Sequence, residues 1–186
     1  QSVEVHPVDP KGIAISNVSL FENHEGQLTY VGLYTEFDEL EHARGYAVVD
    51  ISKQGNVTDF AKLEFPIDVL GEYESSRVLK KLKKNKSKGK LEKVIWEFPK
   101  IQDVIYFDDG SLVINSEQIE GMDYYSPMRG SLQERLYYRD ILACKITPNN
   151  EFDWIMKLGK SQGGGRGGRR SMGFEHIQTD KHRYYF

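Results

Sequence analysis

The chain has 186 residues, of which 39% are hydrophobic, 12% aromatic and 28% charged. This length fits one domain or part of a larger one, and eleven Tyr with nine Phe exclude disorder throughout the chain. A net charge of −3 gives no overall attraction for nucleic acid or anionic lipid. No apolar run has the length of a transmembrane helix, and the single Cys144 excludes an internal disulfide and a multi-thiolate metal site.

The two ends of the sequence are unusual. The chain begins at Gln1 and its first methionine is Met122, so we expect a mature secreted chain, a fragment or the ordered part of a longer protein. The aromatic residues 183–186 predict the start of a β-strand, since aromatic side chains favour strands. An aromatic end of this kind favours a segment of a larger protein.

Two β-hairpins are predicted in the first half of the chain. The apolar runs 18–21 and 28–31 flank a polar turn that contains a glycine. The runs 47–51 and 57–63 flank a second turn of the same kind. Apolar runs on either side of a glycine-containing turn are typical of antiparallel hairpins.

The region 66–100 is predicted to be an insertion with a short helix. Eight lysines and one arginine fall between Arg77 and Lys93, with a serine before this run and Gly89 near its end, both typical helix boundaries. Such a helix would attract phosphate, an anionic lipid headgroup or an acidic partner. The alternative is a solvated helix whose lysines face only water. The candidate binding residues are Lys80, Lys81, Lys83 and Lys84.

The second half repeats the pattern of the first. The runs 104–107 and 112–114 flank an Asp-Asp-Gly turn, and the runs 142–146 and 152–158 flank a polar turn. Residues 177–186 in turn resemble the start of the second half. The sequence therefore contains an internal repeat of four strands.

Four antiparallel strands in tandem predict an all-β, β-propeller-like fold, in which each sheet covers the face of its neighbour. We assign residues 1–100 to a first blade-like repeat with an N-terminal strand and the Lys-rich insertion, and 101–176 to a second with a Gly/Arg loop. Residues 177–186 would start a third. Two blades predict a partial propeller or a segment of a larger one; an antiparallel β-sandwich and an α+β fold are the alternatives.

A second insertion is predicted at residues 119–138. Tyrosines flank this segment, and exposed tyrosines are typical of protein contact surfaces. The alternative is that they pack the insertion onto its own blade. The candidate binding residues are Tyr124, Tyr125, Tyr137 and Tyr138.

The segment from Gly163 to Arg170 is rich in glycine and arginine. Its composition is similar to that of Arg-Gly segments that bind RNA, but there is only one copy and no interleaved aromatic residue. The alternative is a flexible loop between two blades. The candidate binding residues are Arg166, Arg169 and Arg170.

No catalytic set is apparent in the sequence. The five histidines are scattered and form no metal-ligand pattern, so neither a metal site nor a cofactor is expected. Cys144 is predicted to be a small buried residue, and Trp96 and Trp154 are predicted to be packing residues. Glu117 and Asp140 are two carboxylates near a central channel if the fold is a propeller, which is weak support for acid–base chemistry.

One stretch of the second repeat carries a family resemblance. Its residues are Asp109-Gly110-Ser111-Leu112, Glu117-Gln118, Tyr137 to Ile141, Lys145-Ile146, Trp154 and Lys157 to Gln162. In this order they resemble the blade repeat of uncharacterised secreted and envelope proteins of Bacteroidetes-type bacteria, over residues 101–165. The first repeat lacks the tryptophan and the ending with two lysines and a glutamine. The resemblance implies a β-propeller-like fold and a periplasmic, outer-membrane-associated or extracellular location, without a known activity.

The sequence favours a non-catalytic interaction or scaffold module of a bacterial cell envelope. Its partner would be another protein or the rest of a larger chain. One alternative is part of a propeller hydrolase or lyase whose site is shared among blades. The other is binding of an anionic ligand through the Lys-rich and Gly/Arg segments. A membrane surface ranks above nucleic acid as that ligand.

Overall fold

The computed structural model describes most of the chain: residues 12–22, 26–36, 41–90, 93–128, 130–165, 172–178 and 183–186. Antiparallel strands dominate these residues, and they also contain two helices. The all-β class predicted from the sequence is therefore confirmed. None of the sheets closes, so the propeller-like arrangement stays a proposal.

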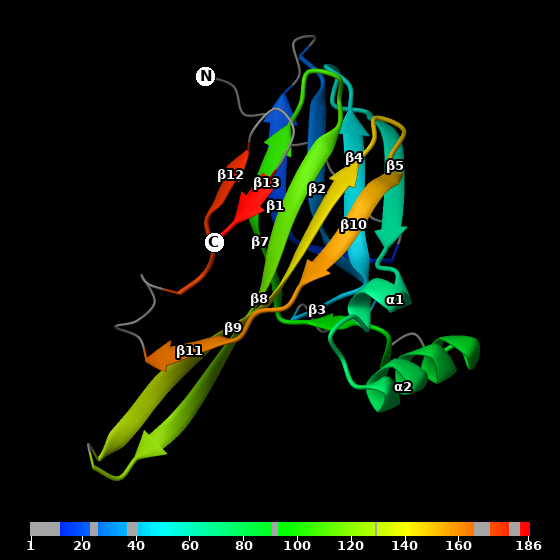
Figure 1. The fold of residues 1–186 in the computed structure, drawn as a ribbon. Coiled ribbons are helices and arrows are strands. Elements are labelled where there is room, and N and C mark those ends of the chain that lie inside the picture. Colours follow the sequence, from blue (N-terminus) through cyan, green and yellow to red (C-terminus); the bar gives the residue numbers. More distant parts are fainter. Residues whose placement is uncertain are drawn as a thin grey trace.

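The first sheet is a four-stranded antiparallel meander (Figure 1). Its strand order is β1-β2-β4-β5, so both hairpins predicted in the first half are confirmed. Gly55 has a φ of +80° in the β4–β5 turn, a conformation that glycine adopts without a steric cost. The strands are β1 (Ala14–Glu22), β2 (Leu28–Thr35), β4 (Gly45–Ile51) and β5 (Val57–Glu64).

The second sheet is also an antiparallel meander, with the order β10-β9-β8-β7. The hairpins predicted in the second half are therefore confirmed. In the β7–β8 turn the Ser111 N–H donates to Asp109 Oδ1 over 2.9 Å, the local bonding that favours Asp in turns. The strands are β7 (Pro99–Tyr106), β8 (Leu112–Ser126), β9 (Ser131–Ile146) and β10 (Phe152–Leu158), and β11 (Gln162–Gly165) pairs with the first half of β9.

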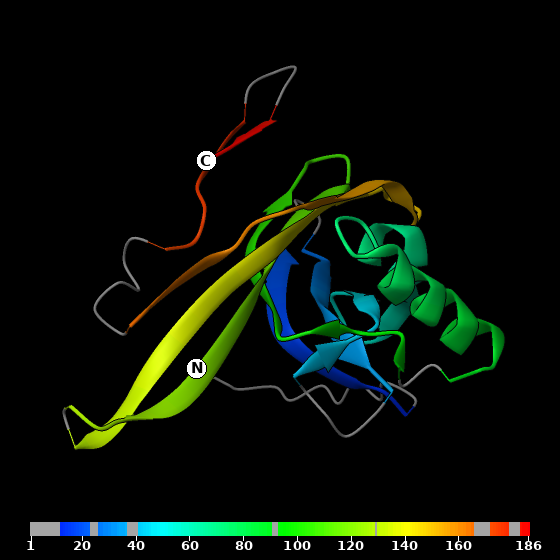
Figure 2. The same ribbon diagram turned by 60° about the horizontal axis from the view of Figure 1, so that its bottom comes forward.

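The two sheets face each other and enclose the main hydrophobic core (Figures 1 and 2). Phe65 and Trp96 close one end of this core with aromatic contacts, since the Tyr46 ring meets Phe65 edge-on and Phe65 meets Trp96 in the same way. The fully buried side chains between the sheets include Val31, Leu33, Tyr46 and Val48 of the first sheet and Leu112, Ile114, Leu142, Cys144 and Ile146 of the second.

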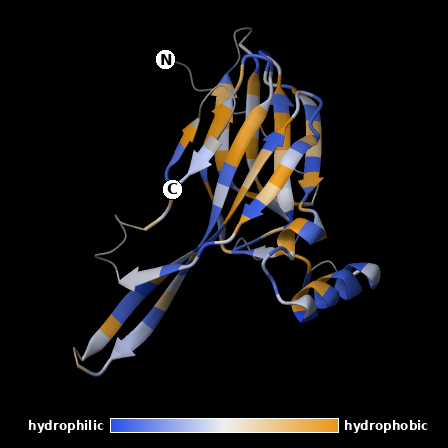
Figure 3. Cartoon of the chain, viewed as in Figure 1, coloured by the Kyte–Doolittle hydropathy of each residue, from blue (hydrophilic) through white to orange (hydrophobic). Residues whose placement is uncertain are grey.

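The central strands are buried on both faces. Every residue of 45–49 in β4 and of 112–117 in β8 is buried, although successive side chains of a strand point to opposite faces. Ala47, next to Val48 of the main core, lies in a second cluster with Ile13 and Tyr34. Figure 3 shows the apolar stretches that run along these strands. The run 45–49 of β4 contains only apolar residues and glycine, which is typical of a strand covered on both sides. The run 112–117 of β8 is apolar only to Ile114 and ends in the buried polar residues Asn115, Ser116 and Glu117.

The Lys-rich insertion forms the predicted helix, α2 (Ser76–Ser87), after a short α1 (Ile67–Leu70). Ser75 caps α2, because its hydroxyl accepts the N–H of Val78 over 3.4 Å. Gly89, just after the helix, has a φ of +66°. A two-residue pair, β3 (His42–Ala43) and β6 (Trp96–Glu97), joins the loops of the two sheets beside α2.

The last described residues form a small hairpin of β12 (His176–Gln178) and β13 (Arg183–Tyr185). The strand predicted at 183–186 is therefore confirmed. The Tyr185 hydroxyl donates to Asn115 Oδ1 over 2.8 Å. Asn115 is on the opposite face of β8 from the core residue Ile114, so this hairpin contacts the outer face of the second sheet.

Candidate functional site

Residues 119–138 form a projecting two-stranded ribbon, named the arm below. It is the continuation of β8 and β9 beyond the second sheet, and it extends away from the body in both views (Figures 1 and 2). The two strands pair without a register shift from Ile119 opposite Tyr138 to Ser126 opposite Ser131. The segment predicted as an insertion is therefore a β-ribbon, because cross-strand pairing keeps both strands regular almost to the turn.

The arm leaves the sheet at a β-bulge. Pairing of Glu117 with Ile141 is followed by pairing of Ile119 with Tyr138, so β9 holds one extra residue here. A bulge bends the strand and increases its twist. It therefore sets the direction in which the arm projects.

The structure separates the four candidate tyrosines. Tyr124 and Tyr125 are exposed, at 50% and 61%. Tyr138 at the base of the arm is buried, with its ring centre 5.6 Å from Lys160 Nζ, so it is not part of the exposed surface of the arm. Tyr137 is half-buried, with the guanidinium groups of Arg135 and Arg139 at 5.4 and 5.8 Å from its ring centre.

Large apolar side chains are concentrated near the tip of the arm. Tyr125 and Leu132, the latter 69% exposed, are directly opposite each other on one face. Met122 and Tyr124 lie on the other face, since they alternate with Tyr125 along the strand. The exposed large apolar residues of the arm are Met122, Tyr124, Tyr125, Met128 and Leu132.

A buried ion pair anchors the base of the arm. Lys160 Nζ donates to Glu117 Oε1 and to the carbonyl oxygen of Gly173. The ring of Phe174 lies 5.8 Å from the same ammonium. Burial raises the pKa of the Glu117 carboxyl, and the bond and charge of Lys160 oppose that rise. The pair fixes the segment around Gly173 to the second sheet.

Asp140, in the bulge, is held by two lysines. Its Oδ2 is 2.8 Å from Nζ of the buried Lys157, and its Oδ1 accepts the backbone N–H of Lys160 over 3.2 Å. Lys157 Nζ also donates to the carbonyl oxygen of Leu70 over 3.1 Å, which ties α1 to β10. The two carboxylates that the sequence singled out are thus engaged by cations of their own chain.

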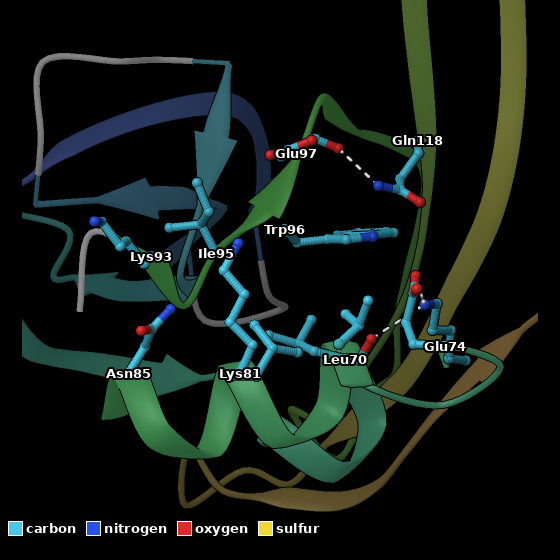
Figure 4. A pocket seen from close by; sticks show the side chains of 12 residues that line it. Leu70, Glu74, Lys81, Asn85, Lys93, Ile95, Trp96, Glu97 and Gln118 are labelled. Atoms are coloured by element: carbon cyan, nitrogen blue, oxygen red, sulfur yellow. Dashed lines mark hydrogen bonds and ion pairs between the residues drawn. The ribbon is translucent and has the colours of Figure 1, made fainter. Parts of the chain in front are cut away.

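Two cavities lie near these groups. One of about 460 Å³ is at the base of the arm and is lined by Glu117, Ile119, Tyr138 and Phe174 among others. The second, of about 430 Å³, lies between α2 and β6. Figure 4 shows Trp96 facing Leu70 across this second cavity, with Lys81, Asn85 and Lys93 toward its other side. Its walls combine apolar surface with amine and amide groups.

The four candidate lysines of α2 are all exposed. Lys83 pairs with Asp68 over 2.7 Å, and both side chains are more than half exposed. Figures 1 and 2 place α2 on the other side of the molecule from β11, the strand that leads into the Gly/Arg segment. The candidate residues Arg166, Arg169 and Arg170 lie outside the described residues.

The prediction of a flexible loop from Gly163 onward is wrong at its start, because Gln162–Gly165 forms β11. A Cβ on Gly163 would lie 3.2 Å from Tyr137 Cδ1. The aromatic ring therefore occupies the space that the glycine leaves, which the low strand propensity of glycine does not reveal. The pairing with β9 is a tertiary contact.

The remaining predictions concern buried residues. Cys144 is fully buried, as expected, and burial raises the pKa of its thiol. Trp96 is buried and Trp154 is half-buried, in line with packing roles. Within the described residues, no group of three or more His, Cys, Asp or Glu side chains is arranged to hold a metal ion. Neither described helix has the length and apolar character needed to cross a membrane.

No family model, curated protein or solved structure matches this chain. The function is therefore argued from the geometry of the arm and of the sheets that carry it.

Proposed function

We propose that the chain is a non-catalytic interaction module that presents the arm to a partner protein. The exposed apolar tip of the arm carries this proposal. Single exposed apolar residues are normal on protein surfaces, but several gathered on one element are typical of a contact surface. Tyr and Met side chains are enriched at such surfaces, since they bury much area.

The base of the arm supports a role in presentation. Lys160 binds Glu117 of β8 next to the bulge, Lys157 binds Asp140 of β9 within it, and β11 adds a third strand beside β9. A contact surface held in one direction loses less conformational entropy on binding than a flexible loop does. The arm is thus ordered before it meets a partner.

The body of the molecule is proposed to be a pair of blade-like units. Two four-stranded meanders stack face to face, and their central strands β4 and β8 are buried on both faces, which supports a stack of more than two layers. We further propose an envelope or extracellular location for it, on the resemblance of residues 101–165. In such a stack, further four-stranded sheets would pack against the outer faces of these two sheets.

Quantitative affinity capture tests the role of the arm. The full chain is immobilised, exposed to the proteins of its source, and compared with a variant in which residues 122–135 are replaced by Asn-Gly. Gly121 and Leu136 are directly opposite each other, so this two-residue turn closes the shortened hairpin. We expect a small set of proteins that binds the full chain and is lost from the shortened variant.

Point variants localise the contact. Tyr124→Ser with Tyr125→Ser should lose the same proteins, whereas Leu20→Ser, which changes an exposed apolar residue of β1, should retain them. An identical set of captured proteins for the full chain and the shortened variant would contradict the proposal. Loss of binding only after the four candidate lysines of α2 are changed to Gln would favour the anionic-ligand alternative.

A further inference from the structure

In the part of the chain that the structure describes, no strand pairs with the outer edge of β8 in the arm. β7 pairs with β8 from Tyr106 opposite Leu112 to Pro99 opposite Gln118 and reaches no further. Past this point β9 is the only strand beside β8 among the described residues. Beyond Ile119 this edge is therefore open toward the described residues.

The backbone groups that point to this edge can be assigned. The N–H of Ile119 donates to the carbonyl oxygen of Phe98 over 2.9 Å, away from β9. Backbone groups of a regular antiparallel strand alternate between its two edges, and the pairing from Ile119 to Ser126 has no register shift. The N–H and C=O groups of Gly121, Asp123 and Tyr125 therefore point to the open edge.

We infer that this edge binds an extended segment of a partner protein as an added β-strand, a contact that rests on the proposed function of the arm. Exposed strand edges with unpaired backbone groups are templates for another strand, and the backbone then supplies affinity while side-chain pockets supply specificity. The same ribbon already accepts a third strand on its other edge, where β11 pairs with residues 135–138 of β9. No lysine, arginine or proline blocks residues 119–126.

The charge of the edge identifies the kind of segment. Asp123 is exposed and makes no ion pair with the described residues, whereas Glu120 is paired with Arg139 over 2.8 Å. The free charge of this edge is thus negative. The partner segment carries Lys or Arg opposite Asp123, and it carries apolar residues next to Met122 and Tyr124 on one face and next to Tyr125 on the other.

The same charge disfavours a second copy of the chain. Antiparallel pairing that aligns residues 121–125 of two copies would bring the two Asp123 side chains directly opposite each other, and like charges in this place destabilise a sheet. The occupant is therefore a different, basic strand.

A phage-displayed library of random nine-residue peptides, selected against the full chain, tests this contact. We expect enriched peptides to alternate apolar residues with a central Lys or Arg. Asp123→Pro removes the N–H that points to the open edge without removing a hydrogen bond to β9. The affinity for the best peptide should therefore fall about tenfold or more. Asp123→Ser keeps the N–H and should weaken it only a few-fold, by loss of an exposed charge pair.

Charge reversal provides a gain-of-function readout that does not depend on how well the proline variant folds. Selection against Asp123→Lys should enrich Asp or Glu at the central peptide position. Unchanged binding to Asp123→Pro and Gly121→Pro, the absence of enriched peptides, or dimers of the chain that Asp123→Pro abolishes would each overturn the inference. If partner proteins bind the full chain and Asp123→Pro but not the variant without the arm, the proposed function is supported and strand addition is contradicted.

Discussion

The hydroxyl groups of Tyr46 and Ser116 are 2.8 Å apart in the interior, one from each sheet. Both residues are fully buried, so this bond is a polar link in an otherwise apolar core. Burial raises the pKa of the Tyr46 phenol well above its usual value, which keeps the hydroxyl protonated. The bond also sets how the two sheets are aligned, since it forms only in one relative position.

Removal of either hydroxyl is expected to destabilise the fold. Tyr46→Phe and Ser116→Ala each leave a buried group without its partner and should lower the free energy of unfolding by about 1–2 kcal/mol. The double variant should lose less than the sum of the two. Urea unfolding of the native chain, the two single variants and the double variant gives this double-mutant cycle. Strictly additive losses of unfolding free energy would show that the two hydroxyls do not interact.

Lys157 is expected to contribute far more to stability than an exposed lysine. Lys157→Met breaks a buried pair with Asp140 and frees the carbonyl of Leu70, which should lower the free energy of unfolding by about 3 kcal/mol. The matched control, Lys83→Met, removes an exposed pair with Asp68 and should cost less than about 1 kcal/mol. Equal losses in urea unfolding would contradict the structural role of Lys157.

Gly45 is expected to tolerate no side chain. A Cβ at this position would lie 2.0 Å from the carbonyl oxygen of Leu63 on the neighbouring strand. Gly45→Ala should therefore lower the free energy of unfolding by about 3 kcal/mol or more. The control Gly165→Ala meets nothing within 4 Å and should change it by less than about 0.5 kcal/mol. Thermal unfolding with a similar midpoint for both variants would refute this close approach.

The pKa of Glu117 predicts a pH dependence of stability. Because its folded pKa is raised above the usual value of 4.5, the folded state binds this proton more tightly than the unfolded chain. The contribution of the group to the free energy of unfolding is thus full below pH 4.5 and falls as pH rises through the folded pKa. The difference in unfolding free energy between the native chain and Glu117→Gln should fall from pH 4 to 7. A rise would mean that Lys160 outweighs burial.

Local sequence signals determined most of the strands. The turns at Gly55 and Gly110 have the positive φ that short polar glycine turns predict, and the alternation of apolar runs with such turns located all four hairpins. The serine before α2 and the glycine after it likewise marked the helix. These features depend on residues close in the chain, where backbone sterics and capping bonds decide the conformation.

The candidate site depended on contacts that local patterns do not contain. The sequence singled out the tyrosines of 119–138, but it could not tell the exposed Tyr125 from the buried Tyr138, because burial comes from Lys160 and from segments distant in the chain. It also identified this region as an insertion without predicting its secondary structure, and the unbroken pairing of β8 with β9 makes it a ribbon. Strand β11 was missed because glycine is depleted in strands, whereas the β9 residues that pair with it, including Tyr137, are distant in the sequence.

The sequence by itself determined which segments form the hairpins of the two sheets and where they turn. Only the tertiary structure decided that β8 and β9 run on past the sheet, that a bulge at Asp140 directs them outward, and that Gly121, Asp123 and Tyr125 direct their backbone groups to an open edge. Hydrogen-bond direction along a strand is set by the register with its neighbours, which is a property of the folded sheet and not of any one segment.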